Sequence, residues 1–172
     1  MPPANDRIKT QTFVCFLIVL IGLLCAGRTR MMRDPGTLWH TVAGERMLDR
    51  HEIIQTDTFS FTQTGEEWIA QQWLAECAMA LIHRLAGLDG LLLIACAMIA
   101  WIFAMLFARS ARAGLPAPLA VLFLFFIAAA GSYHFMPRPH IVTLLFMTFG
   151  TACCATSRRA GFHRSTSSLC RL

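Results

Sequence analysis

Two short polar clusters lie against long apolar runs, and they contain the side chains best suited to chemistry. The first covers residues 33–40, directly after the first apolar run, and the second covers residues 132–140, between the last two runs. Their candidate side chains are Asp34, His40, His134, Arg138 and His140. Charged and imidazole groups at a membrane boundary are costly unless they are solvated or used. We therefore expect a site if the topology brings both clusters to one face.

Asp34 and Arg138 offer the most specific chemistry in these clusters. A carboxylate at a membrane interface serves as a base or as a ligand for a divalent cation. A guanidinium grips a phosphate through two parallel hydrogen bonds, which suits a lipid headgroup or a lipid-linked phosphate. The alternatives are a solvated loop acid beside Pro35 and an arginine that snorkels to fix the depth of a span.

The other candidates are the histidines and the polar start of a helix. Histidines together with a carboxylate are ligand types of a metal site, but their spacing alone does not select one, so a divalent cation stays open as a cofactor. Gln72 and Glu76 are one helical turn apart and share a face. They either line the same site as substrate-binding residues or form a solvated helix start.

The composition is that of an integral membrane protein. Of 172 residues, 56% are hydrophobic and 15% are charged, whereas a soluble domain carries about 25% charged residues. The formal net charge of +5 comes mostly from residues at the ends of apolar runs, where they set orientation. Because the sequence has no basic stripe with interleaved aromatic residues, we expect no nucleic acid as a partner.

The seven cysteines do not indicate redox or metal chemistry. Most lie inside apolar runs, where a thiol behaves as a small hydrophobic group, and there is no Cys-x-x-Cys pair. We expect neither a disulfide framework nor a zinc site. The first apolar run follows Arg7 and Lys9 and lacks a small-residue cleavage pattern, which favours a retained signal anchor.

The apolar runs predict an all-α, polytopic membrane protein with about four transmembrane helices and external amphipathic helices. The predicted spans are residues 12–27, 90–108, 117–133 and 140–156. The remaining segments are predicted to be a cytoplasmic N-terminus at 1–11, an external loop with amphipathic helices at 28–89, and a polar, disordered tail at 157–172.

Two helices are expected within the external loop. Residues 37–50 have the periodicity of a helix that lies at the membrane surface. Its apolar face is expected to hold Leu38, Val42, Met47 and Leu48. Residues 71–86 are apolar enough to enter a membrane but carry an acid, a histidine and an arginine. We favour a juxtamembrane amphipathic helix there, with a full span as the open alternative.

The distribution of basic residues predicts the orientation. If residues 71–86 do not cross the membrane, Arg109 and Arg112 face the cytoplasm together with the basic N-terminus and tail. The same assumption brings both polar clusters to the outer face. We therefore predict a multi-pass protein of the inner (cytoplasmic) membrane with a cytoplasmic N-terminus.

An ordered set of motifs resembles the N-terminal part of a family of large bacterial polytopic membrane proteins. The motifs are residues 34–40 (DPGTLWH) with Gly44-Glu45, residues 56–62 (TDTFSFT), Trp68 with residues 72–76 (QWLAE), and residues 138–140 (RPH). Proteins of that family resemble GT-C-type glycosyltransferases, which use polyprenyl-phosphate-linked sugars. The resemblance covers about residues 12–156.

The resemblance implies sugar transfer from a lipid-phosphate donor at the outer face of the membrane. In that scheme Asp34 is the catalytic acid, acting as a base or helping to hold a divalent cation, and Arg138 contacts the phosphate leaving group. His40, His134 and His140 are supporting, substrate-binding residues. Membrane lipid and a polyprenyl-phosphate-sugar donor are the partners that the resemblance implies.

The resemblance also implies that the chain is a fragment. Members of the family continue through many more spans, and residues 157–172 resemble a truncated or frame-shifted tail. We therefore expect this chain to be too short for activity alone. The alternative is a non-enzymatic integral membrane protein, such as a transporter or an assembly fragment. Transport is disfavoured because the predicted spans hold almost no polar residues to line a path.

Overall fold

The computed structural model describes residues 4–151 and 153–154, and this part of the chain is all-α. Its elements are α1 (Ala4–Met31), α2 (Pro35–Arg50), α3 (Trp73–Arg112), α4 (Ala117–Gly131) and the short 3₁₀ helix η1 (Ser132–His134). An apolar helix over His140–Thr151 follows. The only β pairing among the described residues is an isolated bridge between Thr56 and Glu67. The prediction of an all-α fold is confirmed.

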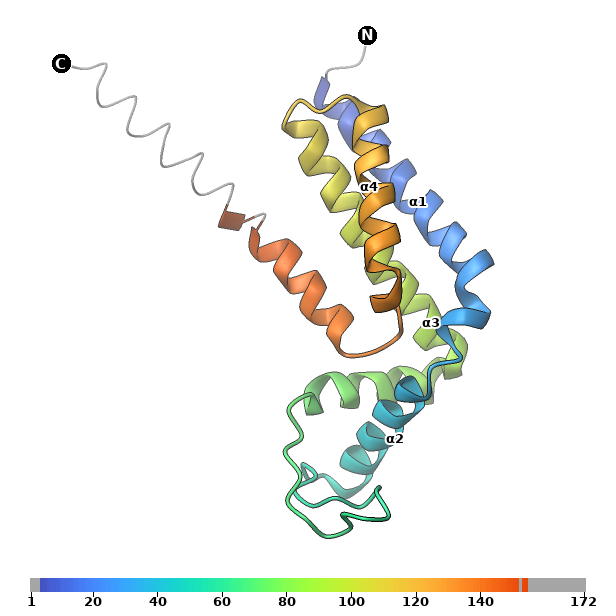
Figure 1. Ribbon diagram of the computed structural model, residues 1–172, viewed down its shortest axis with the longest axis vertical. Helices are drawn as coiled ribbons and strands as arrows, with labels where there is room; N and C mark the ends of the chain where they lie inside the picture. The colour runs from blue at the N-terminus through green and yellow to red at the C-terminus, as the bar shows by residue number, and fades with distance from the viewer. Residues whose placement is uncertain (1–3, 152, 155–172) are drawn as a thin grey trace, which may run out of the picture.

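Three helices in the described part of the chain are long and apolar enough to cross a membrane. They are Asn5–Ala26 within α1, Trp73–Arg112, and Ala117–His134, whereas His140–Thr151 is apolar but shorter. In Figure 1, α1, the second part of α3 and α4 run alongside one another as a bundle. The predicted tail at 157–172, residues 1–3 and the end of the predicted fourth span lie outside the described residues.

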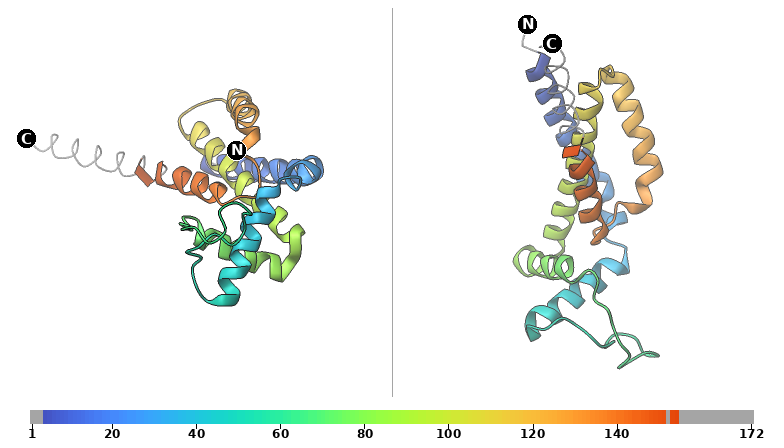
Figure 2. Two further views of the ribbon diagram at one scale, coloured as in Figure 1. Left: turned by 60° about the horizontal axis from the view of Figure 1, so that its bottom comes forward. Right: turned by 90° about the vertical axis from the view of Figure 1, so that its left-hand side faces the viewer.

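Helix α3 is divided at Gly87, whose backbone (φ 62°, ψ −159°) is not helical. This conformation is open to glycine and strongly disfavoured for residues with a Cβ. Residues 73–86 form what we call the lateral segment, because they lie across the end of the bundle, whereas residues 88–112 run along it (Figures 1 and 2). The predicted amphipathic helix at 71–86 is thus crosswise to the predicted span at 90–108.

Helix α2 has clear signals at both ends. Asp34 caps the N-terminus, where its side chain accepts a hydrogen bond from the Gly36 amide at 3.3 Å, and Pro35 occupies the first turn. At the other end, His51 adopts the left-handed conformation (φ 54°) that terminates many helices. The cap fixes Asp34 at the junction between α1 and α2.

Helix α2 packs on the lateral segment mainly through small side chains. Its buried residues are Thr37, Thr41, Ala43, Gly44 and Met47. The helices approach so closely that a Cβ on Gly44 would lie 2.0 Å from the carbonyl oxygen of Glu76. Of the predicted apolar face, Met47 is buried, whereas Leu38 and Val42 are 50% and 42% exposed. Mostly small side chains face the lateral segment, because they fit at so close a crossing.

The core of the bundle lies where the second part of α3 meets α1 and α4. Its buried residues include Leu92, Cys96, Ile99, Phe103, Leu124 and Ile141. Helix α1 packs extensively along α3, and α4 also contacts α3, whereas α1 and α4 barely touch each other. A seam therefore remains between α1 and α4.

Candidate functional site

Asp34 and Arg138 lie 104 residues apart in the chain and form a bidentate ion pair. The guanidinium donates from Nε to Oδ2 and from Nη2 to Oδ1 of the carboxylate, both at 2.5 Å. The aspartate side chain is 5% exposed and the arginine side chain is 41% exposed. The two polar clusters, which the sequence led us to expect on one face, are thus in direct contact.

Local structure on both sides favours this ion pair. A Cβ on Gly36 would lie 2.8 Å from Nε of Arg138, so the glycine leaves room for the guanidinium beside the helix cap. Pro137 and Pro139 are buried and flank the arginine. Since proline fixes the backbone φ angle, these two residues limit the positions that the arginine can take. The loop thus directs Arg138 toward the N-terminus of α2.

The pKa of Asp34 is lowered from 3.8 to about 2. The hydrogen bond from Arg138 is the largest cause, burial acts in the opposite direction, and the Gly36 amide and Thr37 hydroxyl add to the lowering. A carboxylate with so low a pKa, with both oxygens accepting hydrogen bonds, is a weak base near neutral pH. In this geometry Asp34 orients the guanidinium, and acting as a base requires the ion pair to loosen.

His40 and Glu76, both predicted as substrate-binding residues, contact each other. Nδ1 of His40 lies 2.8 Å from Oε1 of Glu76, and the side chains are 20% and 8% exposed. A second imidazole–carboxylate pair, His83 with Glu45 at 2.8 Å, joins the same two helices. These contacts hold α2 on the lateral segment. They also direct Glu76 toward α2 and away from solvent.

His134, His140 and Gln72 stand apart from these pairs. Nε2 of His140 lies 2.6 Å from the backbone carbonyl oxygen of His134, and the ring centroids are 6.1 Å apart. Gln72 is exposed, and its carbonyl oxygen accepts a hydrogen bond from the amide of Glu76 at the start of α3. The predicted site residues therefore form separate groups. Among the described residues, the Asp34–Arg138 pair is the one hydrogen-bonded link between the two polar clusters.

Among residues 4–151 and 153–154, no group of three or more His, Cys, Asp or Glu side chains is arranged to hold a metal ion. The carboxylate of Asp34 already faces a guanidinium. A divalent cation at Asp34 would therefore compete with Arg138 for the same oxygens.

The loop between α2 and α3 is organised by residues whose contacts the sequence did not reveal. The Ser60 hydroxyl and the amides of Ser60 and Phe59 donate to the carboxylate of Asp57, which lowers the pKa of that acid. Trp39 packs against Phe59 and Trp68, with ring centroids 4.4 and 5.8 Å apart. The Asp-x-x-Ser spacing is a signal of such a turn. The aromatic cluster has no comparable signal because its members come from separate segments.

Comparisons of the chain with protein-family models, curated proteins and solved structures find no match. The likeness to GT-C-type glycosyltransferases therefore rests on the sequence motifs alone. The geometry adds a buried carboxylate that orients a partly exposed guanidinium at the end of an apolar helix bundle. Such an arrangement is suited to binding an anion.

Proposed function

We propose that this chain is a GT-C-like membrane glycosyltransferase, or the N-terminal part of one, that uses a lipid-phosphate-linked sugar at the outer face of the inner membrane. In this proposal the end of the bundle that carries α2 and the lateral segment faces outward. The N-terminus of α1 is then cytoplasmic. Arg109 and Arg112, at the other end of α3, support this orientation through the positive-inside rule.

The observation that carries the proposal is the free edge of the Arg138 guanidinium. Asp34 engages Nε and Nη2, whereas Nη1 makes no hydrogen bond within the described part of the chain, and the side chain is 41% exposed. A guanidinium that is held on one side keeps its orientation, so less entropy is lost when its other edge binds a ligand. We assign this edge to the phosphate of the donor.

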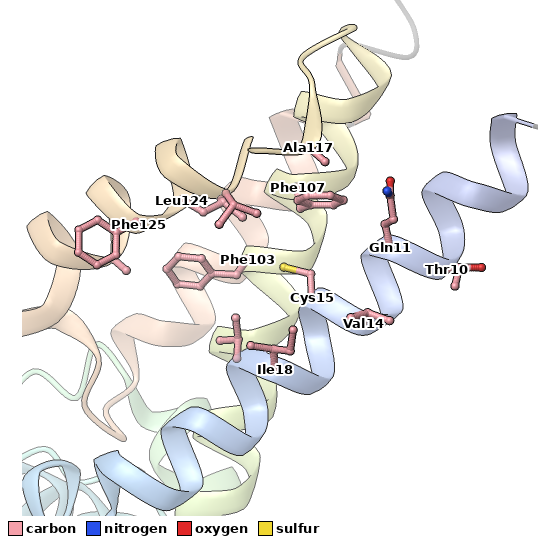
Figure 3. A pocket seen from close by; sticks show the side chains of 13 residues that line it. Thr10, Gln11, Val14, Cys15, Ile18, Phe103, Phe107, Ala117, Leu124 and Phe125 are labelled. Atoms are coloured by element: carbon pink, nitrogen blue, oxygen red, sulfur yellow. The ribbon is translucent and has the colours of Figure 1, made fainter. Parts of the chain in front are cut away.

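An apolar groove along the bundle suits the hydrocarbon tail of such a donor. Its volume is about 450 Å³, and side chains of α1 and α4 border it while Phe103 and Phe107 of α3 form its floor (Figure 3). A smaller cavity of about 260 Å³ lies in the same seam, lined by Met31 of α1 and by Met136, two residues from Arg138. A lipid tail in this seam would bring its phosphate to the ion pair.

In this scheme, binding of a phosphate changes the pKa of Asp34. The phosphate shares the positive charge of Arg138, which weakens the hold of the guanidinium on the carboxylate and raises the pKa of Asp34. The carboxylate then moves toward the range in which it accepts a proton from an acceptor hydroxyl. This is the role as a base that the sequence resemblance implies for Asp34.

Binding of a polyprenyl phosphate to the purified chain tests the assignment of Arg138. We expect Arg138→Gln to weaken binding at least about tenfold, because a charge-assisted hydrogen bond contributes about 1.5–3 kcal/mol. The affinity of Arg138→Lys should lie between those of the wild type and Arg138→Gln, since lysine keeps the charge but loses the planar fork. Native mass spectrometry or a lipid titration in detergent measures the affinities.

Two further variants make the outcome decisive. Asp34→Asn with Arg138→Gln keeps the site neutral and avoids an unpaired buried carboxylate. Arg109→Gln removes a cation that donates to the Thr151 hydroxyl at 2.6 Å and should leave binding unchanged. Equal affinity in all variants would overturn the role of Arg138. No binding of the polyprenyl phosphate by the wild-type chain would favour a non-enzymatic membrane protein.

A further inference from the structure

One face of the lateral segment presents an unbroken row of apolar side chains. Leu74, Leu81 and Leu85 are 67%, 53% and 79% exposed. Ala78, between the first two, is also exposed. These four positions recur at the spacing of one side of an α-helix, and we call them the leucine row. So much leucine surface on one helix face indicates a partner.

The opposite side of the lateral segment packs against α2. Glu76, Met79 and Ala80 are buried there, and His83 reaches Glu45 of α2. At 3.6 residues per turn these positions lie about half a turn from the leucine row. Helix α2 lies beyond the lateral segment, on the side away from the bundle (Figures 1 and 2). The leucine row therefore faces the side on which the spans enter the bilayer.

We propose that the leucine row rests in the interfacial layer of the lipid bilayer and anchors α2 and the connecting loop at the membrane surface. Its apolar surface continues onto the span of the same helix, where Leu88, Leu93 and Trp101 are 42%, 50% and 49% exposed. A helix with one apolar and one polar face, lying in the plane of the membrane, binds lipid in this way. Trp73, at the start of the segment, is a residue type that favours the interface.

The break at Gly87 and the charges around it fit this placement. An unbroken helix of 40 residues would be about 60 Å long, twice the hydrocarbon core of about 30 Å. Arg84 pairs with Asp49 of α2, and Asp89 pairs with Arg28 of α1 at 3.0 Å. Charged side chains are thus engaged with neighbouring helices, and the leucine row itself carries none.

Nitroxide labels at single cysteines test the proposal in the full chain, reconstituted in phosphatidylcholine vesicles. The labels replace Leu74, Leu81 and Leu85 in a background without the natural cysteines, and Phe61, which is 100% exposed in the loop, is the control. We expect apolar oxygen to reach the three leucine positions more readily than a water-soluble nickel complex does. The preference should reverse at Phe61. Unchanged thermal unfolding shows that the labelled chains are folded.

The depth profile separates the possible occupants of this surface. A bilayer contact gives similar depths at all three leucine positions. A segment that crosses the membrane instead gives depths that change by up to about 16 Å between Leu74 and Leu85, which would overturn the proposal.

Two other results would identify a different occupant. Exclusion of both reagents would show that protein covers the leucine row, either a second copy or another helix. Free access of the nickel complex would show that the row faces water. Both results contradict a lipid anchor, and neither depends on sugar transfer.

Discussion

The ion pair between Asp34 and Arg138 determines how this end of the bundle responds to mutation. Asp34 is 5% exposed, and a buried carboxylate is costly unless it is paired and hydrogen-bonded. Removing Arg138 alone therefore leaves an uncompensated charge, whereas removing both groups does not. Any loss of binding in an arginine variant must for this reason be compared with the neutral double variant.

Acid should weaken the fold through Asp34. Its folded pKa of about 2 lies below the ordinary value of 3.8, so the stabilisation is complete above pH 3.8 and is lost as the pH falls through about 2. At neutral pH this contribution is on the order of 2 kcal/mol. The free energy of unfolding of wild type and Asp34→Asn should therefore differ at pH 7 and converge near pH 2.

An exposed acid provides the matched control for this measurement. Asp49 pairs with Arg84, and their side chains are 67% and 42% exposed. Because exposed ion pairs contribute little, Asp49→Asn should change the free energy of unfolding by less than about 1 kcal/mol. A difference between wild type and Asp34→Asn that stays constant from pH 7 to pH 2 would show that the ion pair does not stabilise the fold.

The sequence indicated the candidate residues better than the partners that they contact. Asp34 and Arg138 stand out because charges beside apolar runs are unusual. Their direct pairing could not be predicted, since it depends on how a loop meets a helix cap 104 residues away. His40 and Glu76 were likewise recognisable as polar residues near a membrane boundary. Their contact depends on the crossing of α2 and the lateral segment, which periodicity does not specify.

At the scale of elements, the close crossing of α2 and the lateral segment is the most sensitive contact. Gly44→Ala places a Cβ 2.0 Å from the carbonyl oxygen of Glu76, so the two helices must move apart. We expect a loss of about 1–3 kcal/mol in the free energy of unfolding, which is typical of overpacking. Reversible unfolding in mixed micelles measures it.

A second glycine of the same chain is the control. Gly22, in α1, has no atom within 4 Å of a Cβ built on it. Gly22→Ala should therefore be neutral, or stabilising by up to about 1 kcal/mol through helix propensity. Equal effects of the two substitutions would mean that α2 does not lie against the lateral segment as described.

The helices themselves could largely be predicted, whereas their contact surfaces could not. An amphipathic helix over residues 37–50 was expected, and α2 (Pro35–Arg50) is there. The face that packs on the lateral segment could not be predicted, because apolar periodicity does not separate a face against protein from a face against lipid. Gly44 and its small neighbours form that face, since the helix backbones are so close. The break at Gly87 follows from one backbone conformation that only a glycine accepts readily.

At the scale of the whole molecule, the topology decides whether the site exists. The loop between α2 and α3 lies at one end of the bundle and the turn between α3 and α4 at the other (Figure 1). The long apolar runs sufficed to predict these helices, because hydrocarbon admits few alternatives. Composition could not settle whether residues 71–86 cross the membrane. In the structure they lie crosswise to the apolar helices of the bundle.

Cysteine accessibility in intact cells tests the central claim most directly. Thr62 in the loop and Ala113 in the turn after α3 are both exposed, and each is replaced by cysteine in a background without the natural thiols. An impermeant maleimide should label position 62 from outside and should reach position 113 only after the membrane is permeabilised. Labelling of position 113 in intact cells would instead place the turn after α3 outside and contradict the proposed orientation of the Asp34–Arg138 site.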